Sequence, residues 1–115
     1  MKRNGLHIDT DGTKRWYKED KLHRDDGPAL IWADGSNFWY KEGKLHRDDG
    51  PAIIYSSGRQ EWWKDGNWHR DDGPAVICTS GTHYWYKYDK PYEPSAHDLM
   101  VWKMNERRNI ERTSH

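Results

Sequence analysis

The sequence predicts a mostly β protein, an antiparallel β-meander of tandem 23-residue repeats with a C-terminal α-helix. The string His-Arg-Asp-Asp-Gly-Pro-Ala occurs three times at a constant spacing, at residues 23–29, 46–52 and 69–75. Short runs of aromatic and β-branched residues, which favour strands, accompany each copy. After residue 94 the pattern changes to one typical of a capped helix.

The composition allows a folded domain without a broad aliphatic core. Of the 115 residues, 33% are hydrophobic and 33% are charged, a balance that alone would favour disorder. Eight Trp, seven Tyr and one Phe argue against disorder, because these rings bury large surfaces. We therefore expect one modest domain held together by large rings on short strands.

Charge and hydropathy restrict the class of protein. The net charge is zero, with 19 basic and 19 acidic residues, so we expect no direct contact with nucleic acid. Residues 1–12 contain no signal-peptide core, and the longest apolar runs, 29–33 and 99–102, are too short to span a bilayer. These short runs also mean that no membrane partner is expected. Cys78 is the single cysteine, which indicates a location in a reducing cytoplasm.

The repeat divides the chain into two parts. Residues 1–94 form the array, with a half-repeat at 1–12, repeats at 13–35, 36–58 and 59–81, and a partial repeat at 82–94. We call the three repeats units 1, 2 and 3. The incomplete copies at either end are expected to cap the array. Residues 95–115 are predicted to be a capping helix and tail.

Each unit contains two strand signals. The first is centred on Trp-Tyr-Lys or Trp-Trp-Lys, and the second is an apolar run such as Leu30-Ile31-Trp32. Glu42-Gly43 and Asp65-Gly66 are hairpin-turn signals. Asp-Asp-Gly-Pro indicates a second turn, because Pro can begin a strand but cannot lie inside one.

Side chains alternate between the faces of a strand, so the strands predict rows of equivalent residues. The first strand gives an invariant row, Trp16, Trp39, Trp62 and Trp85, and opposite it Tyr17, Tyr40, Trp63 and Tyr86. The second strand gives Ile8, Ile31, Ile54 and Ile77, and opposite them Leu30, Ile53 and Val76. The sequence does not determine which rows share a face. We expect the invariant Trp and Ile rows to form the main core.

The C-terminal segment predicts a helix over about residues 96–111. Ser95 and Asp98 resemble a capping box, with Ser95 as N-cap. Leu99, Trp102 and Ile110 share roughly one helical face, and Arg107, Arg108 and Arg112 lie near the end, where they favour the helix dipole. The helix should cover the last repeat and close an open sheet edge.

The unit resembles the MORN repeat, which also pairs an aromatic strand, a Gly turn and a second strand ending in Gly. Residues 39–46 and Ser57-Gly58 carry the resemblance, which covers about residues 6–90. The chain departs from the familiar motif after the His, where Arg-Asp-Asp-Gly-Pro-Ala follows. That string is similar to a MORN-like variant in small proteins of phages, bacteria and large DNA viruses. The resemblance implies a scaffold, a contact for proteins or lipids, or an antitoxin-like protein.

The His-Arg-Asp-Asp string could act chemically, with His as a base and the carboxylates orienting it. Catalysis needs one constellation, however, and a set that recurs in every unit usually makes the unit fold. We therefore expect no catalytic residues and a structural role for the string, in which the imidazole or guanidinium bonds turn carboxylates and backbone. The residues concerned are His23, Arg24, Asp25, Asp26, His46, Arg47, Asp48, Asp49, His69, Arg70, Asp71 and Asp72.

Metal and cysteine chemistry are less favoured. Equivalent ligands in successive units would be about 9–10 Å apart, two strand spacings, which is too far for one zinc shell. Cys78 replaces Trp32 and Tyr55 at the equivalent position. It could be a nucleophile, but we expect a small thiol that fills space where the helix packs. No metal or other cofactor is expected.

The aromatic residues outside the expected core are the candidate recognition surface, since Tyr and Trp bury area at low entropy cost. We expect partner contacts from Tyr17, Trp32, Tyr40, Tyr55, Trp63 and Tyr86. The helix or a second copy in a homodimer could cover these rings instead.

The leading hypothesis is a non-enzymatic module that binds another protein. Through the resemblance it would be a phage-encoded inhibitor or adaptor of a host defence or toxin protein, located in the host cytoplasm. The alternatives are a sponge for a nucleotide or sugar, and a hydrolase that uses the His-Arg-Asp-Asp edge.

Overall fold

The protein is described by a computed structural model, which covers the backbone of residues 1–113 and the side chains of residues 1–108. Within residues 1–113 the chain forms short strands and one helix. Their bounds are β1 (Gly5–Ile8), β2 (Lys14–Lys18), β3 (Lys21–Leu22), β4 (Leu30–Ile31), β5 (Asn37–Phe38), β6 (Tyr40–Lys41), β7 (Lys44–Leu45), β8 (Ile53–Ile54), β9 (Gln60–Glu61), β10 (Trp63–Lys64), β11 (Asn67–Trp68), β12 (Val76–Ile77), β13 (His83–Tyr84), β14 (Tyr86–Lys87), β15 (Lys90–Pro91) and α1 (Ala96–Thr113).

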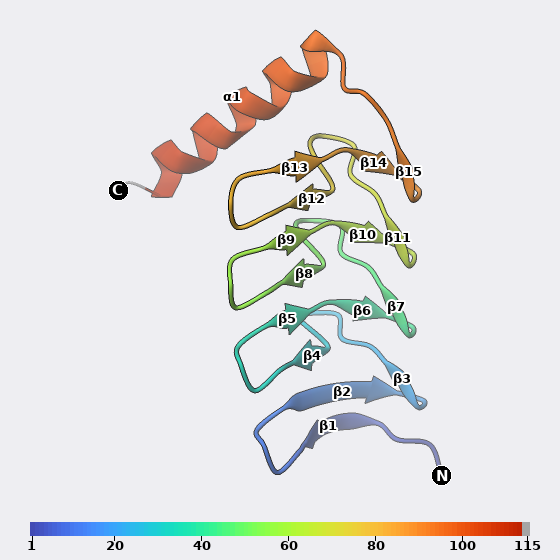
Figure 1. Cartoon of the computed structure of the whole chain (residues 1–115). Helices are drawn as coiled ribbons and strands as arrows, with labels where there is room; N and C mark the ends of the chain where they lie inside the picture. Colours follow the sequence, from blue (N-terminus) through green and yellow to red (C-terminus); the bar gives the residue numbers. More distant parts are fainter. Residues whose placement is uncertain (114–115) are drawn as a thin grey trace.

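The units stack along one axis and share one long sheet (Figure 1). Its strand order is β1-β2-β4-β5-β8-β9-β12-β13, with β3 also paired to β2, and the neighbouring strands are antiparallel. The register repeats from unit to unit, because Arg15 pairs with Leu30, Phe38 with Ile53 and Glu61 with Val76. The predicted antiparallel meander of 23-residue units with a C-terminal helix is therefore confirmed.

A hairpin projects from each unit beside this sheet. The pairs β6–β7, β10–β11 and β14–β15 each form a separate two-stranded sheet. In these copies the first strand is interrupted at its Trp, whereas β2 of unit 1 runs unbroken from Lys14 to Lys18. The hairpin turn at Glu42-Gly43 has φ values of 49° and 83°, the left-handed pair that a tight hairpin turn requires.

The prediction that the chain reverses its direction at Asp-Asp-Gly-Pro is wrong. Both β3 and β4 pair antiparallel with β2, so they run in the same direction. The string between them is a loop that leaves the sheet and returns to it. The second reversal of each unit lies at its closing Gly, where the N–H of Gly35 (φ 93°) donates to the carbonyl of Trp32 at 2.9 Å.

The pairing settles which rows share a face. Leu30 pairs with Phe38, whose ring meets Trp32 and Tyr55 at centroid distances of 5.9 and 5.7 Å. We call this side the aromatic face; it carries the Leu30 row and the Tyr17 row. The invariant Trp row lies on the opposite side, together with the Ile31 row, and we call that side the arginine face.

The expectation that the Trp and Ile rows form the main core is wrong for the Ile row and for every member of the Trp row except Trp85. Leu30, Ile53 and Val76 are 4, 3 and 2% exposed, whereas Ile31 and its equivalents are half-buried and Ile8 is 55% exposed. The cross-strand neighbours of the Ile row are polar and supply little apolar cover. They are Lys14, Asn37, Gln60 and His83.

The helix α1 begins at the predicted capping box. The backbone N–H of Asp98 donates to Ser95 Oγ at 3.0 Å, and the N–H of Ser95 donates to Asp98 Oδ2 at 2.9 Å. These bonds hold the pKa of the Asp98 carboxyl below its usual value. Leu99 is half-buried and Arg107 and Arg108 are exposed, while the side chains of Ile110 and Arg112 lie outside the described residues.

The helix covers the last Trp of the array, as predicted. The Trp102 ring meets Trp85 edge-on at 5.8 Å and lies 4.8 Å from the His83 ring. Trp85 is consequently 6% exposed, whereas Trp16, Trp39 and Trp62 are half-buried. The helix therefore packs on the arginine face, across the end of the stack beside β13 (Figure 1).

Replacing Trp102 with Ala should lower the free energy of unfolding by about 3 kcal/mol, because the change uncovers Trp85 and leaves a cavity between the helix and the array. Met104, on the same helix but 49% exposed, is the control. Met104→Ala should change stability by less than about 0.5 kcal/mol. Equal urea midpoints for the two variants would show that the helix does not stabilise the last unit.

Candidate functional site

The Arg of each string lies over the ring of the invariant Trp of the same unit. Arg47 Cζ is 3.9 Å from the centre of the Trp39 ring, and Arg24 and Arg70 stand 3.9 Å from Trp16 and Trp62. Arg47 Nε donates to Asp49 at 2.9 Å and Nη1 donates to the Pro51 carbonyl at 3.0 Å. The guanidinium is therefore held in one orientation by stacking, an ion pair and a backbone acceptor.

The Gly of the string is needed for close approach. A Cβ atom at Gly50 would lie 2.9 Å from Arg47 Cζ, and at Gly73 it would lie 2.6 Å from Arg70 Cζ. The guanidinium is thus enclosed between the Trp ring and the Gly backbone. Any side chain at this position would push the Arg off the ring.

The His of each string links its unit to the next one. His46 Nε2 donates to Asp48 at 2.9 Å, and Nδ1 accepts the backbone N–H of Asp65 in the following hairpin at 3.1 Å. His23 bonds Asp25 and Glu42 in the same way, and His69 bonds Asp71 and Tyr88. A neutral imidazole protonated on Nε2 satisfies both contacts. The carboxylate and backbone partners are those expected from the sequence.

This geometry limits what the string can do chemically. Both nitrogens of each imidazole are engaged, and their side chains are 6–10% exposed, whereas a general base needs a free nitrogen within reach of its substrate. Two grooves of about 720 and 650 Å³ separate successive strings on this face. Their rims carry both charges, such as Arg47 and Asp49. Among the described residues, no three His, Cys, Asp or Glu side chains gather as a metal site.

The six residues expected to contact a partner lie on the aromatic face, but among the described residues the ring contacts join only four of them, and the Tyr17 ring lies under Arg3. Trp32, Phe38 and Tyr55 form one edge-to-face series, and Trp63, Trp68 and Tyr86 form a second at centroid distances of 5.3 and 5.0 Å. Trp32 is 40% exposed and the other five predicted residues are half-buried. Burial raises the pKa of Tyr40 and Tyr55.

The sequence interpretation missed Phe38, Trp68 and Tyr84, which extend the same face. Tyr84 is 49% exposed and occupies the position of Phe38 two units later in the stack. Trp68 replaces Leu22 and Leu45 of the other units. That departure from the repeat was the available signal, and it lies on the return strand of the hairpin, which was not predicted as a strand.

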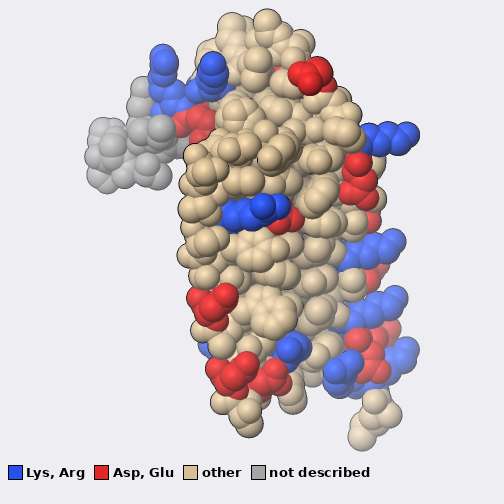
Figure 2. All heavy atoms as spheres, in the orientation of Figure 1, with Lys and Arg blue, Asp and Glu red and all other residues tan. Residues whose placement is uncertain are grey.

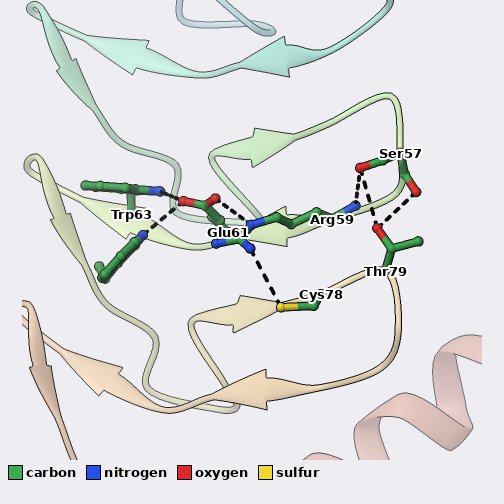
Figure 3. Close-up of polar contacts among 7 residues, drawn as sticks. Ser57, Arg59, Glu61, Trp63, Cys78 and Thr79 are labelled. Carbon is green, nitrogen blue, oxygen red and sulfur yellow. Dashed lines mark hydrogen bonds and ion pairs between the residues drawn. The ribbon is translucent and has the colours of Figure 1, made fainter.

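A buried carboxylate organises the aromatic face in unit 3. Glu61 is 4% exposed, and its Oε1 accepts the indole N–H groups of Trp63 and Trp68, both at 3.0 Å (Figure 3). Its Oε2 accepts Arg59 Nε at 3.0 Å. The three donors compensate the burial of the charge and fix the two indole rings. The sequence interpretation did not identify this cluster.

The predicted place of Cys78 beneath the helix is wrong. Cys78 lies on the aromatic face, where Arg59 Nη1 approaches its sulfur at 3.7 Å (Figure 3). The helix packs on the opposite face. The small side chain leaves room beside Glu61 that Arg59 occupies, whereas unit 1 and unit 2 carry Trp32 and Tyr55 at this position.

Comparison of the chain with known protein families, curated proteins and solved structures found no match. No helix within residues 1–113 has the length and apolar character needed to cross a membrane.

Replacing His46 with Ala should lower the free energy of unfolding by about 1–2 kcal/mol, because the Asp65 N–H of the next unit loses its acceptor. His97, which is exposed on the helix, provides the control, and His97→Ala should leave the urea midpoint nearly unchanged. Metal retained after chelation, or an activity lost without a change in stability, would contradict a structural role for the string.

A double-mutant cycle tests the enclosure of the guanidinium. Gly50→Ala should destabilise the native protein by about 1 kcal/mol or more, since its Cβ displaces Arg47 from Trp39. In an Arg47→Ala background the same change should cost little, because the side chain it collides with is gone. Additive losses in urea unfolding would show that Gly50 and Arg47 do not act together.

Proposed function

We propose that this protein is a non-enzymatic, protein-binding repeat module whose aromatic face contacts the partner. The observation that supports the proposal is the division of the two faces. The Arg loops and the helix cover the arginine face, while nine aromatic side chains line the other. They are Tyr17, Trp32, Phe38, Tyr40, Tyr55, Trp63, Trp68, Tyr84 and Tyr86.

The chemistry of this face suits a protein partner. Figure 2 shows a broad area largely free of charged side chains, with a basic and an acidic patch near its middle and the other lysines, arginines and carboxylates mainly along its margins. An aromatic centre with a charged rim is typical of protein interfaces. Half-buried rings held by their neighbours lose little entropy on binding, which favours them as contact residues.

The two alternative functions have less support. In both aromatic series the rings meet at interplanar angles of 41–84°, so they touch one another and leave no parallel slot for a stacked nucleotide or sugar. A hydrolase would need a free base, and each string imidazole bonds through both nitrogens. These observations favour the binding module.

We also propose the narrower role of a phage-encoded inhibitor or adaptor of a host defence or toxin protein. This part rests on the resemblance of the Leu-His-Arg-Asp-Asp-Gly-Pro-Ala string to MORN-like sequences. Growth rescue of cells that express a candidate toxin or defence protein together with this chain would test it directly.

Paired substitutions separate packing from recognition. With ligands selected from a peptide-display library on the immobilised full chain, Tyr40→Ala and Trp63→Ala should each weaken binding by about 2 kcal/mol and leave the fold intact. Trp39→Ala should instead destabilise the protein by about 3–5 kcal/mol, because Arg47 loses its ring. Melting temperature and affinity are measured for all three.

The opposite pattern, in which Tyr40→Ala unfolds the chain and Trp39→Ala folds but loses the ligand, would exchange the roles of the two faces. Ligands that bind all three variants unchanged would place recognition away from both rows.

A further inference from the structure

Unit 3 differs from both unit 1 and unit 2 at ten positions, and five of these meet in space. Arg59 stands where units 1 and 2 have a small hydroxyl residue, and Trp63 stands where they have Tyr. Trp68 replaces their Leu, and Cys78 replaces a large aromatic residue. At the fifth position, Glu61 replaces Arg15 and Phe38. We call these five residues the Glu61 cluster.

Hydrogen bonds connect all five members. Glu61 bonds Arg59, Trp63 and Trp68, each at 3.0 Å, and Arg59 Nη1 lies 3.7 Å from the sulfur of Cys78. The other five differences are exchanges between similar residues, at Gln60, Asp65, Asn67, Val76 and Thr79. The five largest chemical changes thus meet in one network on the aromatic face, which indicates a site built into one unit of the array.

The cluster fixes a cation beside an aromatic surface. The Glu61 side chain is 5% exposed and its charge is shared by three donors, whereas the Arg59 side chain is 39% exposed. Arg59 donates through Nε to Glu61 and through one N–H of Nη1 to the Cys78 sulfur, which leaves the second N–H of Nη1 and the Nη2 group for an incoming carboxylate. A guanidinium edge of this kind binds a carboxylate through two parallel hydrogen bonds.

The rings beside Arg59 define the apolar part of the site. Trp63 and Trp68 lie 5.3 Å apart, Trp68 and Tyr86 lie 5.0 Å apart, and all three are half-buried. Their tilted arrangement forms a shelf that extends from unit 3 onto the next hairpin. An apolar side chain placed here would be buried against three rings while an adjacent carboxylate reaches Arg59.

We infer that the Glu61 cluster is the specificity site of the aromatic face, and that it takes a segment of a partner protein carrying an Asp or Glu carboxylate next to an aromatic side chain. The inference rests on the proposed function, because it names the partner chemistry of that same face. The charge complementarity is local: the carboxylate pairs with Arg59, and the ring packs on the Trp63–Trp68 shelf.

The repeat itself supplies a matched variant. In the repeat-restored protein the cluster is replaced by the residues of unit 2, through Arg59→Ser, Glu61→Phe, Trp63→Tyr, Trp68→Leu and Cys78→Tyr. Each of these residues already occupies the equivalent position of a folded unit, so the array should be retained. Arg59→Lys is the second variant, which keeps a charge for Glu61 but has no planar fork.

The probe is a random dodecapeptide library displayed on phage, selected on the native chain with the repeat-restored protein as competitor. Enriched peptides should share an acidic residue beside an aromatic one. Synthetic copies should bind the native chain and lose about tenfold in affinity with Arg59→Lys, and a change of their acidic residue to its amide should have the same effect. Intact folding of each variant is checked by its melting temperature.

Several results would overturn the inference. One is an enriched set without acidic residues, and another is equal binding to native and Arg59→Lys proteins. Peptides weakened by Tyr40→Ala but not by Arg59→Lys would keep the aromatic face as the binding surface and exclude the cluster. Peptides insensitive to both changes would remove the proposed function as well. N-acetyltryptophan binding as tightly as the peptides would assign the site to a small aromatic acid.

Discussion

The stacking of one Arg on one Trp in every unit is the contact on which the rest of the array depends. Because Arg47 must lie on Trp39, the string leaves the sheet after β7 and returns at Ala52, which is fully buried. The same contact requires Gly50, and it places Asp49 and the Pro51 carbonyl as hydrogen-bond acceptors. A seven-residue string thus recurs unchanged because its members enclose one guanidinium.

The ends of the array show what replaces this contact where the repeat stops. In the last partial unit Tyr92 stands at the His position, and Trp85 packs against Tyr92 and Trp102 at 6.0 and 5.8 Å. The outer hairpin turns also differ, since Asp20 and Asp89 hold positive φ where the inner turns have Gly. Their carboxylates accept hydrogen bonds from the backbone N–H groups of Arg3 and Trp68. Each of these hydrogen bonds offsets part of the backbone strain that a positive φ imposes on Asp.

Periodicity was sufficient to predict the fold class, the units and the helix cap, because an exact repeat and the Ser95–Asp98 pair report local geometry. It did not predict the buried row. Ile31 and Leu30 are equally apolar, and their exposure depends on cross-strand neighbours that the register brings to each side. The loop path of the string was missed for a related reason. Asp-Asp-Gly-Pro is typical of a turn, and only the antiparallel pairing of both β3 and β4 with β2 shows that the chain does not reverse.

The Glu61 cluster could not be predicted from the repeat, because its five residues are not shared with units 1 and 2. A buried carboxylate with an Arg and two indole donors costs desolvation, and an apolar replacement of similar volume is often as stable. Unit 2 contains such a replacement in Phe38, next to Leu30, Ile53 and Tyr55. Since an apolar side chain fills this position in unit 2, stability does not require Glu61 in unit 3. Its retention together with Arg59, Trp63 and Trp68 is better explained by the surface that these residues present than by the fold that they share.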